Sequence, residues 1–252
     1  MEEIPKVKYL DIPAVTSEQM SQIDEIATKD FGVEIEFMME HASRLLANLS
    51  EVYLSEGKFK KPKIVVLAGK GNNGGGVLTA ARYLVNKGYD IQIITSSPIE
   101  ELYENAERQA IILEKMNSFV ELFDYEKHKS SILEADFIIE GLLGYSILGD
   151  PKPPISQLID LANNSEAVIL SNDIPSGLNP DNGMPGNPTI KATATLTLAL
   201  PKVGILGLNP SEYTGKLFLG NIHIPQGVYE KIGITITEKE IYNGKELLEL
   251  TG

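Results

Sequence analysis

Three segments of the sequence combine amide, carboxylate or hydroxyl side chains with glycine in patterns that could serve chemistry. In the first segment, residues 69–76, five glycines occur in eight residues with Asn72 and Asn73 between them. An apolar, β-branched run (64–68) precedes it, and apolar residues at helical spacing (77–85) follow. A glycine-rich turn from strand to helix presents backbone N–H groups to phosphate. A plain tight turn is the alternative, although turn geometry alone hardly explains two amide side chains there.

This glycine segment matches neither standard nucleotide-binding pattern well. A Walker A loop ends in Gly-Lys-Ser/Thr, whereas residues 75–77 read Gly-Gly-Val. Residues 69–74 satisfy G-x-G-x-x-G, but the match is weak in so glycine-rich a segment. No acidic residue closes the next strand at the expected ribose position, since residues 91–98 read IQIITSSP. Ordinary NAD binding by a standard Rossmann domain is therefore disfavoured.

The second segment follows an apolar strand (167–170) and reads Asn-Asp-Ile-Pro-Ser-Gly from Asn172. A carboxylate such as Asp173 at the end of a buried strand is partly desolvated and suited to proton transfer. Alternatively, Asp173 and Ser176 form an Asx-turn and only satisfy backbone N–H groups. Because the sequence lacks the elbow motif G-x-S-x-G, a hydrolase triad of these two residues with His223 is not expected.

The third segment, residues 140–150, begins with Glu140 at the end of another apolar run. Its glycines allow a ligand to approach the backbone closely. Carboxylate, amide, hydroxyl and carbonyl oxygens are hard ligands that suit an alkali or alkaline-earth cation. A carboxylate simply exposed at a strand end is an equally good interpretation of Glu140 alone. The histidines (His41, His128 and His223) show no metal-ligand spacing, and we expect structural roles for them.

An alternating framework must bring these segments together. We expect strands at 64–68, 91–95, 119–122, 135–140, 167–170, 193–199 and 217–223, and helices at 76–87, 99–116, 126–133 and 155–163. Two more helices, 16–32 and 34–53, precede the first strand. Strands separated by helices predict a mostly parallel, doubly wound sheet covered on both faces. Ligands bind at the carboxyl ends of such strands, so the three segments should meet at one edge.

The composition narrows the class of protein. The 252 residues are 42% hydrophobic and carry a net charge of −13, which disfavours a nucleic-acid surface. No apolar run reaches the roughly 18 residues of a membrane span, and we expect a cytoplasmic protein without a secretory signal. The sequence contains no cysteine, so disulfides and thiolate metal sites are excluded. We expect one domain over 1–252, with a helical arm (1–58), a Rossmann-like core (62–235) and a loosely attached, charged tail (236–252).

Together the segments resemble the YjeF N-terminal domain family. Residues 69–77 (GKGNNGGGV) resemble its GxGNNGGDG, and residues 172–183 (NDIPSGLNPDNG) its DIPSGLD-x-D-x-G. Residues 144–150 (GYSILGD) are similar to its substrate loop. Residues 39–42 (MEHA) and 200–204 (LPKVG) are similar to its M-E-x-A-G and PK-x-G. The motifs occur in the family's order across residues 16–225.

The resemblance implies a three-layer αβα Rossmann-like fold, a homodimer and a bound potassium ion (K+). Enzymatic members are NAD(P)H-hydrate epimerases, which interconvert the S and R forms of hydrated NADH and NADPH (NADHX and NADPHX). These substrates carry a hydroxyl at C6 of the nicotinamide ring, and a separate NAD(P)H-hydrate dehydratase is the expected functional partner. By position, Asp173 is the acid/base, and Asn73, Glu140 and Ser176 hold potassium. The residues expected to line the substrate are Asn72, Asn73, Gly74, Gly75, Gly76, Gly144, Tyr145, Ser146, Ile147, Leu148, Gly149, Asp150 and Asp173.

Two positions depart from the family pattern. Gly76 replaces an aspartate of the glycine segment, and Glu140 replaces a shorter aspartate at a strand end. The missing carboxylate favours an alternative, a non-catalytic member that binds a nucleotide or acts as a dimeric scaffold; in that case Gly76→Asp should raise activity. Retention of Asn73, Asp173 and Ser176 favours the enzyme. An unrelated nucleotide-binding enzyme of the same fold class is the third interpretation.

Overall fold

The computed structural model describes residues 4–57, 59–146, 149–206, 211–235 and 237–252. The described strands are β1 (Lys6–Lys8), β2 (Ile64–Ala68), β3 (Ile91–Thr95), β4 (Val120–Leu122), β5 (Phe137–Gly141), β6 (Val168–Asn172), β7 (Ala194–Leu198), β8 (Lys216–Gly220) and β9 (Leu247–Thr251). The described α-helices are α1 (Ser17–Lys29), α2 (Ile35–Glu56), α3 (Asn72–Asn86), α4 (Glu104–Lys115), α5 (Tyr125–Leu133), α6 (Ile155–Asn163), α7 (Ser211–Thr214), α8 (Gln226–Lys231) and α9 (Glu238–Ile241). Short 3-10 helices are η1 (Tyr9–Asp11), η2 (Ile99–Glu101) and η3 (Val203–Leu206). None of the helices in these ranges is long and apolar enough to cross a membrane.

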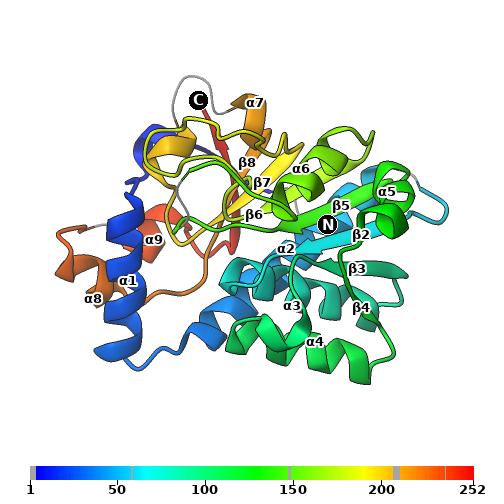
Figure 1. The fold of residues 1–252 in the computed structure, drawn as a ribbon. Helices are drawn as coiled ribbons and strands as arrows, with labels where there is room; N and C mark the ends of the chain where they lie inside the picture. Colours follow the sequence, from blue (N-terminus) through cyan, green and yellow to red (C-terminus); the bar gives the residue numbers. More distant parts are fainter. Residues whose placement is uncertain (1–3, 58, 147–148, 207–210, 236) are drawn as a thin grey trace.

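All described strands form one sheet in the order β1-β9-β8-β7-β6-β5-β2-β3-β4 (Figure 1). Every pair is parallel except β8 with β9. The six strands from β4 to β7 repeat the doubly wound order 3-2-1-4-5-6, whose switch point here lies between β2 and β5. The predicted Rossmann-like fold with a mostly parallel sheet is therefore confirmed.

Alternation along the central strands explains the layers. Ile64, Val66 and Ala68 of β2 pack with α2, α3 and α4, whereas Val65 and Leu67 pack with α5 and α6. Figure 1 shows these two groups of helices on opposite faces of the sheet. A β-strand directs successive side chains to opposite faces, so a strand buried on both sides reads as continuously apolar.

The N-terminal helices begin where the sequence predicts. At the start of α1, Thr16 Oγ1 accepts a hydrogen bond from Gln19 N, and Gln19 Oε1 accepts one from Thr16 N. This capping box satisfies backbone donors that a helix start leaves unpaired. Helix α1 packs beside α8, and α2 packs along α3. Both N-terminal helices therefore extend the layers that surround the carboxyl ends of the strands.

Two predicted segments differ in the structure. The helix expected over 99–116 is divided into η2 and α4, because Tyr103 N donates to the Lys70 carbonyl (2.8 Å) and ties the chain there to the glycine segment. The expectation of a loosely attached tail over 236–252 is wrong for the last strand, β9. Strand β9 pairs with both β8 and β1, and it buries Leu248 and Leu250. Its side chains alternate between buried and partly buried positions, as expected of a strand with one face on the core.

Candidate active site

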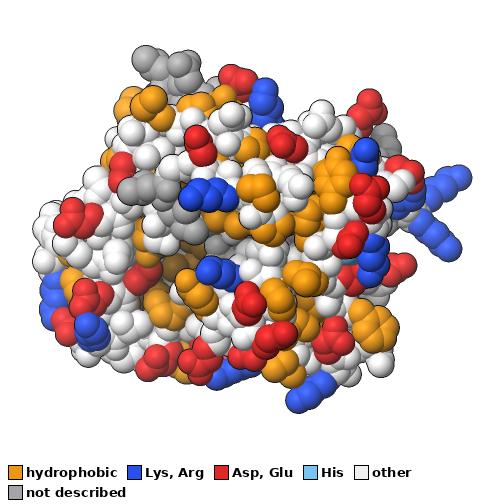
Figure 2. Space-filling model, in the orientation of Figure 1, with side chains coloured by type: hydrophobic (Ala, Val, Ile, Leu, Met, Phe, Trp, Pro, Cys, Tyr) orange, Lys and Arg blue, Asp and Glu red, His pale blue; other side chains and the backbone are white. Residues whose placement is uncertain are grey.

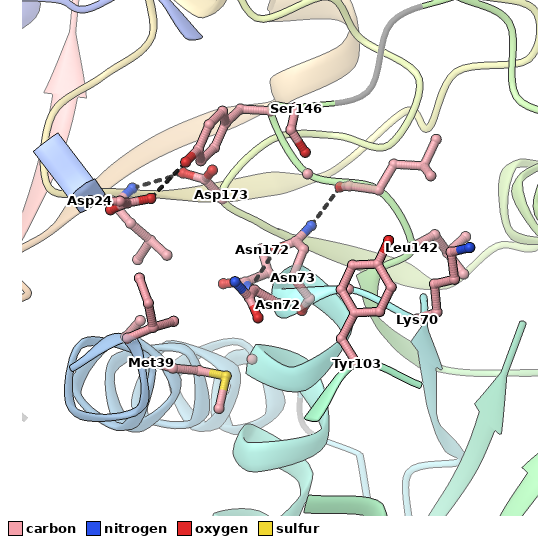
Figure 3. A pocket seen from close by; sticks show the side chains of 18 of the residues that line it. Asp24, Met39, Lys70, Asn72, Asn73, Tyr103, Leu142, Ser146, Asn172 and Asp173 are labelled. Atoms are coloured by element: carbon pink, nitrogen blue, oxygen red, sulfur yellow. Dashed lines mark hydrogen bonds between the residues drawn. The ribbon is translucent and has the colours of Figure 1, made fainter. Parts of the chain in front are cut away.

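A cavity of about 630 Å³ lies at the carboxyl ends of β2, β3, β5 and β6 (Figure 3). Its walls come from α1, α2, the glycine segment, the turn after β3, the loops after β5 and β6, and Lys202. The space-filling view shows a recess among hydrophobic side chains, with Lys, Arg, Asp and Glu around it (Figure 2). All three segments singled out in the sequence contribute to this cavity, as the topology predicts.

Asp173 follows β6 in a strained backbone conformation and lines the cavity. Its φ of 63° is left-handed, a region that costs most non-glycine residues about 1–3 kcal/mol and that Asp tolerates better than most. The backbone holds this geometry, because Asp173 N donates to Leu196 O (2.7 Å). Asp173 Oδ1 accepts from Leu198 N (3.2 Å), whereas Oδ2 accepts no hydrogen bond within the described ranges. One carboxylate oxygen is thus anchored and the other is available to a ligand.

Lys202 is the cationic partner of Asp173. Its side chain is 1% exposed, and Nζ donates to Asp173 Oδ1 and to the Leu198 carbonyl (3.2 Å). Asp173 itself is 6% exposed. A buried carboxylate needs a paired cation or several hydrogen bonds, and here it has both. Lys202 lies within the LPKVG motif, but the sequence alone predicts no role for it, since nothing local connects it to a residue on another strand.

A second carboxylate, Asp24 of α1, also lines the cavity. It accepts a hydrogen bond from the Tyr145 hydroxyl (2.6 Å), and burial raises the pKa of Asp24 above its ordinary value. The Tyr145 ring lies 5.8 Å from Lys202 Nζ, and burial raises the pKa of its hydroxyl. Asp24 was not predicted from the sequence as a site residue. A charged residue on the same helix face as the buried Met20 and Ala27 is the signal that could have indicated it.

The three residues expected to hold a cation meet around the loop after β5. Glu140 is 0% exposed, and its Oε1 accepts from Ser176 N (3.1 Å). Its Oε2 accepts from Ser176 Oγ (2.6 Å) and Leu142 N (3.2 Å). Asn73 Nδ2 donates to Leu143 O (2.6 Å), the carbonyl that Ser176 Oγ also approaches at 3.4 Å. Burial raises the pKa of Glu140, because these neighbours are neutral.

This donor set suits a monovalent cation. It offers the Ser176 hydroxyl, the Leu143 carbonyl and the Glu140 carboxylate, with a total charge of at most −1. Asn73 turns its amide nitrogen to Leu143 O and its oxygen to Asn172. No ion pair to Glu140 occurs within the described ranges, so a cation would neutralise a buried charge. The same ranges contain no cluster of three or more His, Cys, Asp or Glu side chains able to hold a metal ion. Binding here would therefore depend on neutral oxygens rather than on several carboxylates.

Glycines of the first segment serve close packing rather than an open loop. Helix α3 begins at Asn72, so Gly74, Gly75 and Gly76 lie in its first turns and are buried. A Cβ on Gly74 would lie 1.8 Å from Gly69 O, and one on Gly75 would lie 3.4 Å from Ala106 Cα. The expectation of a loop over all of 69–76 is wrong because packing outweighs the low helix propensity of glycine.

Asn172, the last residue of β6, fills the space beside Gly76. A Cβ on Gly76 would lie 2.6 Å from Asn172 Nδ2. This amide nitrogen donates to Asn73 Oδ1 (2.7 Å), while Asn172 Oδ1 is buried without a partner in the described structure. Asn172 is 3% exposed and lines the cavity, so a bound ligand could supply the missing donor.

Gly74 and Gly75, which are buried within α3, line neither cavity, and the other described residues predicted to line the substrate divide between two cavities. Asn72, Asn73, Gly76, Gly144, Tyr145, Ser146 and Asp173 line the large cavity. Gly149 and Asp150 line a neighbouring cavity of about 200 Å³. Asp150 Oδ1 accepts from Asn187 N (2.9 Å) and so fixes a loop. Ile147 and Leu148 lie outside the described residues.

Comparisons with known proteins agree with this geometry. The sequence pattern of the family described as "YjeF-related protein N-terminus" matches residues 35–204. The NAD(P)H-hydrate epimerase of Dehalogenimonas lykanthroporepellens is 35% identical over 88% of this chain and 87% of that protein. The bifunctional NAD(P)H-hydrate repair enzyme Nnr of Moorella thermoacetica is 30% identical over 84% of this chain and 41% of that protein. The crystal structure of yeast YNL200c has a TM-score of 0.80, 22% identity, and covers 95% of this chain and 100% of that one, which shows the shared fold.

Proposed function

The chain belongs to the YjeF-related N-terminal family, and we propose that it is an NAD(P)H-hydrate epimerase, an isomerase that interconverts the S and R forms of NADHX and NADPHX. The observation that carries this proposal is Asp173, whose carboxylate projects into the large cavity with one oxygen anchored by Lys202 and the other available. The relative from Dehalogenimonas lykanthroporepellens, similar over most of both chains, carries that activity in its name.

The chemistry requires that one C–O bond break and re-form on the other face of the ring. C6 carries the hydroxyl next to the ring nitrogen, so protonation of the hydroxyl by Asp173 releases water and the nitrogen lone pair stabilises a planar C6. Water then adds to the opposite face and returns a proton to the Asp173 carboxylate. These two reaction steps are redox-neutral and need only a positioned acid/base.

Lys202 and Tyr145 support this step from fixed positions. Lys202 holds Oδ1 of Asp173 and adds a positive charge that the fold keeps in place. Tyr145 lines the same cavity as Asp173, and its hydrogen bond to Asp24 holds it there. Groups that are already oriented lose no rotational freedom when the substrate binds, which favours reaction.

We also propose that Asn73, Glu140 and Ser176 hold a potassium ion, together with the Leu143 carbonyl. When bound, the ion would supply fixed positive charge at the end of β5. The support is the all-oxygen donor set around Glu140, described above, and its total charge of at most −1. Within the described ranges, Ser176 Oγ and Glu140 Oε1 each accept one hydrogen bond and retain a lone pair for a ligand, and Asn73 Oδ1 accepts one from Asn172 Nδ2.

The wider setting is also a proposal. The bifunctional name of the Moorella thermoacetica relative supports a functional link to an NAD(P)H-hydrate dehydratase. We further infer a homodimer, as the family resemblance implies, and a location in the cytoplasm, which the sequence predicts.

The function is tested by following the two epimers directly. A sample enriched in R-NADPHX is incubated with purified protein in potassium chloride, and S and R forms are separated by chromatography. The epimers should approach equilibrium much faster than in buffer alone. Equal rates with and without protein, for both NADHX and NADPHX, would refute the epimerase assignment.

A further inference from the structure

The strand order indicates where the two halves of a dinucleotide substrate lie. That the substrate is a dinucleotide rests on the proposed function. In the doubly wound order 3-2-1-4-5-6, a dinucleotide crosses the switch point, and the adenosine ribose lies beyond the second strand. The second strand here is β3, whereas Asp173 follows β6 on the other side of the switch point. These strands are three spacings apart, about 14 Å. With the nicotinamide ring at Asp173, the adenosine half lies over β3.

The end of β3 offers hydroxyls where enzymes that select NAD have a carboxylate. Ser96 and Ser97 follow β3 directly and line the cavity. The carboxylates among the described lining residues are Asp24 and Asp173, both at the other end. Nearby acidic residues Glu100 and Glu101 of η2 are exposed and do not line the cavity. An acidic group that accepts from the ribose 2′-hydroxyl also repels a 2′-phosphate, and no such group faces this end.

Lys70 supplies positive charge at the same end of the cavity. Lys70 and Lys202 are the basic residues of the described lining, and Lys202 is committed to Asp173. Lys70 forms no ion pair within the described ranges; its Nζ lies 5.7 Å from the centre of the Tyr103 ring. Tyr103 is 56% exposed, so its ring can stack on an adenine. Figure 3 shows Lys70 and Tyr103 on one side of the cavity and Asp24 and Asp173 on the other.

We propose that Lys70, with Ser96 and Ser97, forms a binding site for the adenosine 2′-phosphate, so that NADPHX is preferred to NADHX. The net charge of −13 repels phosphate at long range, so a local cation matters more here than on a basic protein. A lysine ammonium and serine hydroxyls are suitable donors for a phosphate, and only the phosphorylated cofactor uses all of them.

Binding of two adenosine probes tests this site without requiring turnover. Adenosine 2′,5′-bisphosphate and adenosine 5′-monophosphate are titrated calorimetrically into the wild type, Lys70→Met and the control Lys115→Met, an exposed lysine of α4. The wild type and the control should bind the bisphosphate about tenfold more tightly, and Lys70→Met should lose this difference. Equal affinities in the wild type, or an unchanged ratio in Lys70→Met, would overturn the proposal.

Kinetics separate this inference from the proposed function. In the epimer assay, Lys70→Met should lower kcat/KM for NADPHX about tenfold and leave NADHX nearly unchanged. Ser97→Asp should shift the preference toward NADHX. If the wild type epimerises both substrates and Lys70→Met affects them equally, the function stands and the phosphate site is wrong. If neither substrate reacts but the probe difference depends on Lys70, the phosphate site stands and the epimerase assignment is wrong.

Discussion

Asn172 changes how the missing carboxylate at Gly76 should be interpreted. Its amide lies where a side chain on residue 76 would have to go, and it holds Asn73 Oδ1 at 2.7 Å. The cavity wall is therefore filled by a polar group from β6 rather than left open. This arrangement removes the main reason to regard the chain as a degenerate scaffold.

Restoring the family's aspartate alone should therefore harm the enzyme. In Gly76→Asp the new Cβ would lie 2.6 Å from Asn172 Nδ2, so Asn172 and Asn73 must shift. We expect kcat/KM to fall about 10–100-fold, because small displacements of positioning groups have effects of this size. The double variant Gly76→Asp/Asn172→Ala removes the clash and should recover part of the loss. A gain of activity in Gly76→Asp alone would contradict this account.

Because the Glu140 carboxyl group is buried, we expect the stability of the protein to depend on pH and on potassium. Burial raises its pKa from the ordinary 4.5, so its contribution to stability is full below pH 4.5 and is lost as pH rises through the folded-state pKa. A bound cation favours the ionised form and opposes this loss. In choline chloride, Tm should fall with rising pH more in the wild type than in Glu140→Gln, and potassium chloride should restore Tm only in the wild type. Equal responses to potassium in both proteins would exclude Glu140 as a ligand.

Which site residues could be found from the sequence depended on local patterns. Asp173 and Ser176 share one short segment after an apolar run, and Glu140 ends another, so their positions at strand ends could be predicted. Lys202 and Asp24 come from distant elements and reach the cavity only through the fold. Asn172 belongs to the same segment as Asp173, but its contact with Gly76 depends on how closely α3 approaches β6.

At the scale of elements, helix α1 is tied to the loop after β5. Asp24 of α1 and Tyr145 of the loop form a direct hydrogen bond of 2.6 Å. Tyr145 also lies against Lys202. One helix outside the Rossmann-like core thus positions a wall of the cavity, although the family pattern matches only residues 35–204 and leaves α1 out.

Removing that hydrogen bond should weaken substrate binding more than the chemical step. Tyr145→Phe frees the loop and leaves the Asp24 carboxyl without its donor, so we expect KM to rise about tenfold with a smaller change in kcat. Glu25→Gln, an exposed change on the same helix, is the control. An unchanged KM in Tyr145→Phe would show that the loop is held by other contacts.

The helices and strands whose bounds could be predicted are those with a strong local preference for their structure. Strands β2 and β3 and helix α6 have the predicted bounds, because continuous apolar runs and helical spacing are strong local signals. The start of α3 was missed because three successive glycines disfavour a helix in isolation. Only contacts with Gly69, Ala106 and Asn172, which sequence periodicity does not reveal, explain why glycine is accepted there.

Across the whole molecule, both ends of the chain complete one side of the sheet. Among the described strands β1 pairs with β9 alone, and β9 joins it to β8. The charged composition of 236–252 obscured this, since a strand of five residues (Leu-Leu-Glu-Leu-Thr) is a weak signal beside so many charged neighbours. The C-terminal strand is part of the core that supports α1 and the cavity.

A substitution in β9 should therefore affect global stability. Leu248 is buried against the core, so Leu248→Ala should lower the free energy of unfolding by about 2–5 kcal/mol. Glu249→Ala, whose ion pair with Lys6 is partly exposed, should change it by less than about 1 kcal/mol. Urea unfolding of the two variants measures the difference, and equal stabilities would mean that β9 does not support the core.

The proposed epimerisation depends most on proton transfer by Asp173. The most direct measurement compares the wild type with Asp173→Asn in the epimer assay, with circular dichroism to establish that both are folded. Asparagine keeps the shape and an acceptor for Lys202 but cannot transfer the proton, so the rate should fall about 10²–10⁴-fold. A folded Asp173→Asn protein that epimerises NADHX and NADPHX as fast as the wild type would show that Asp173 does not carry the proton.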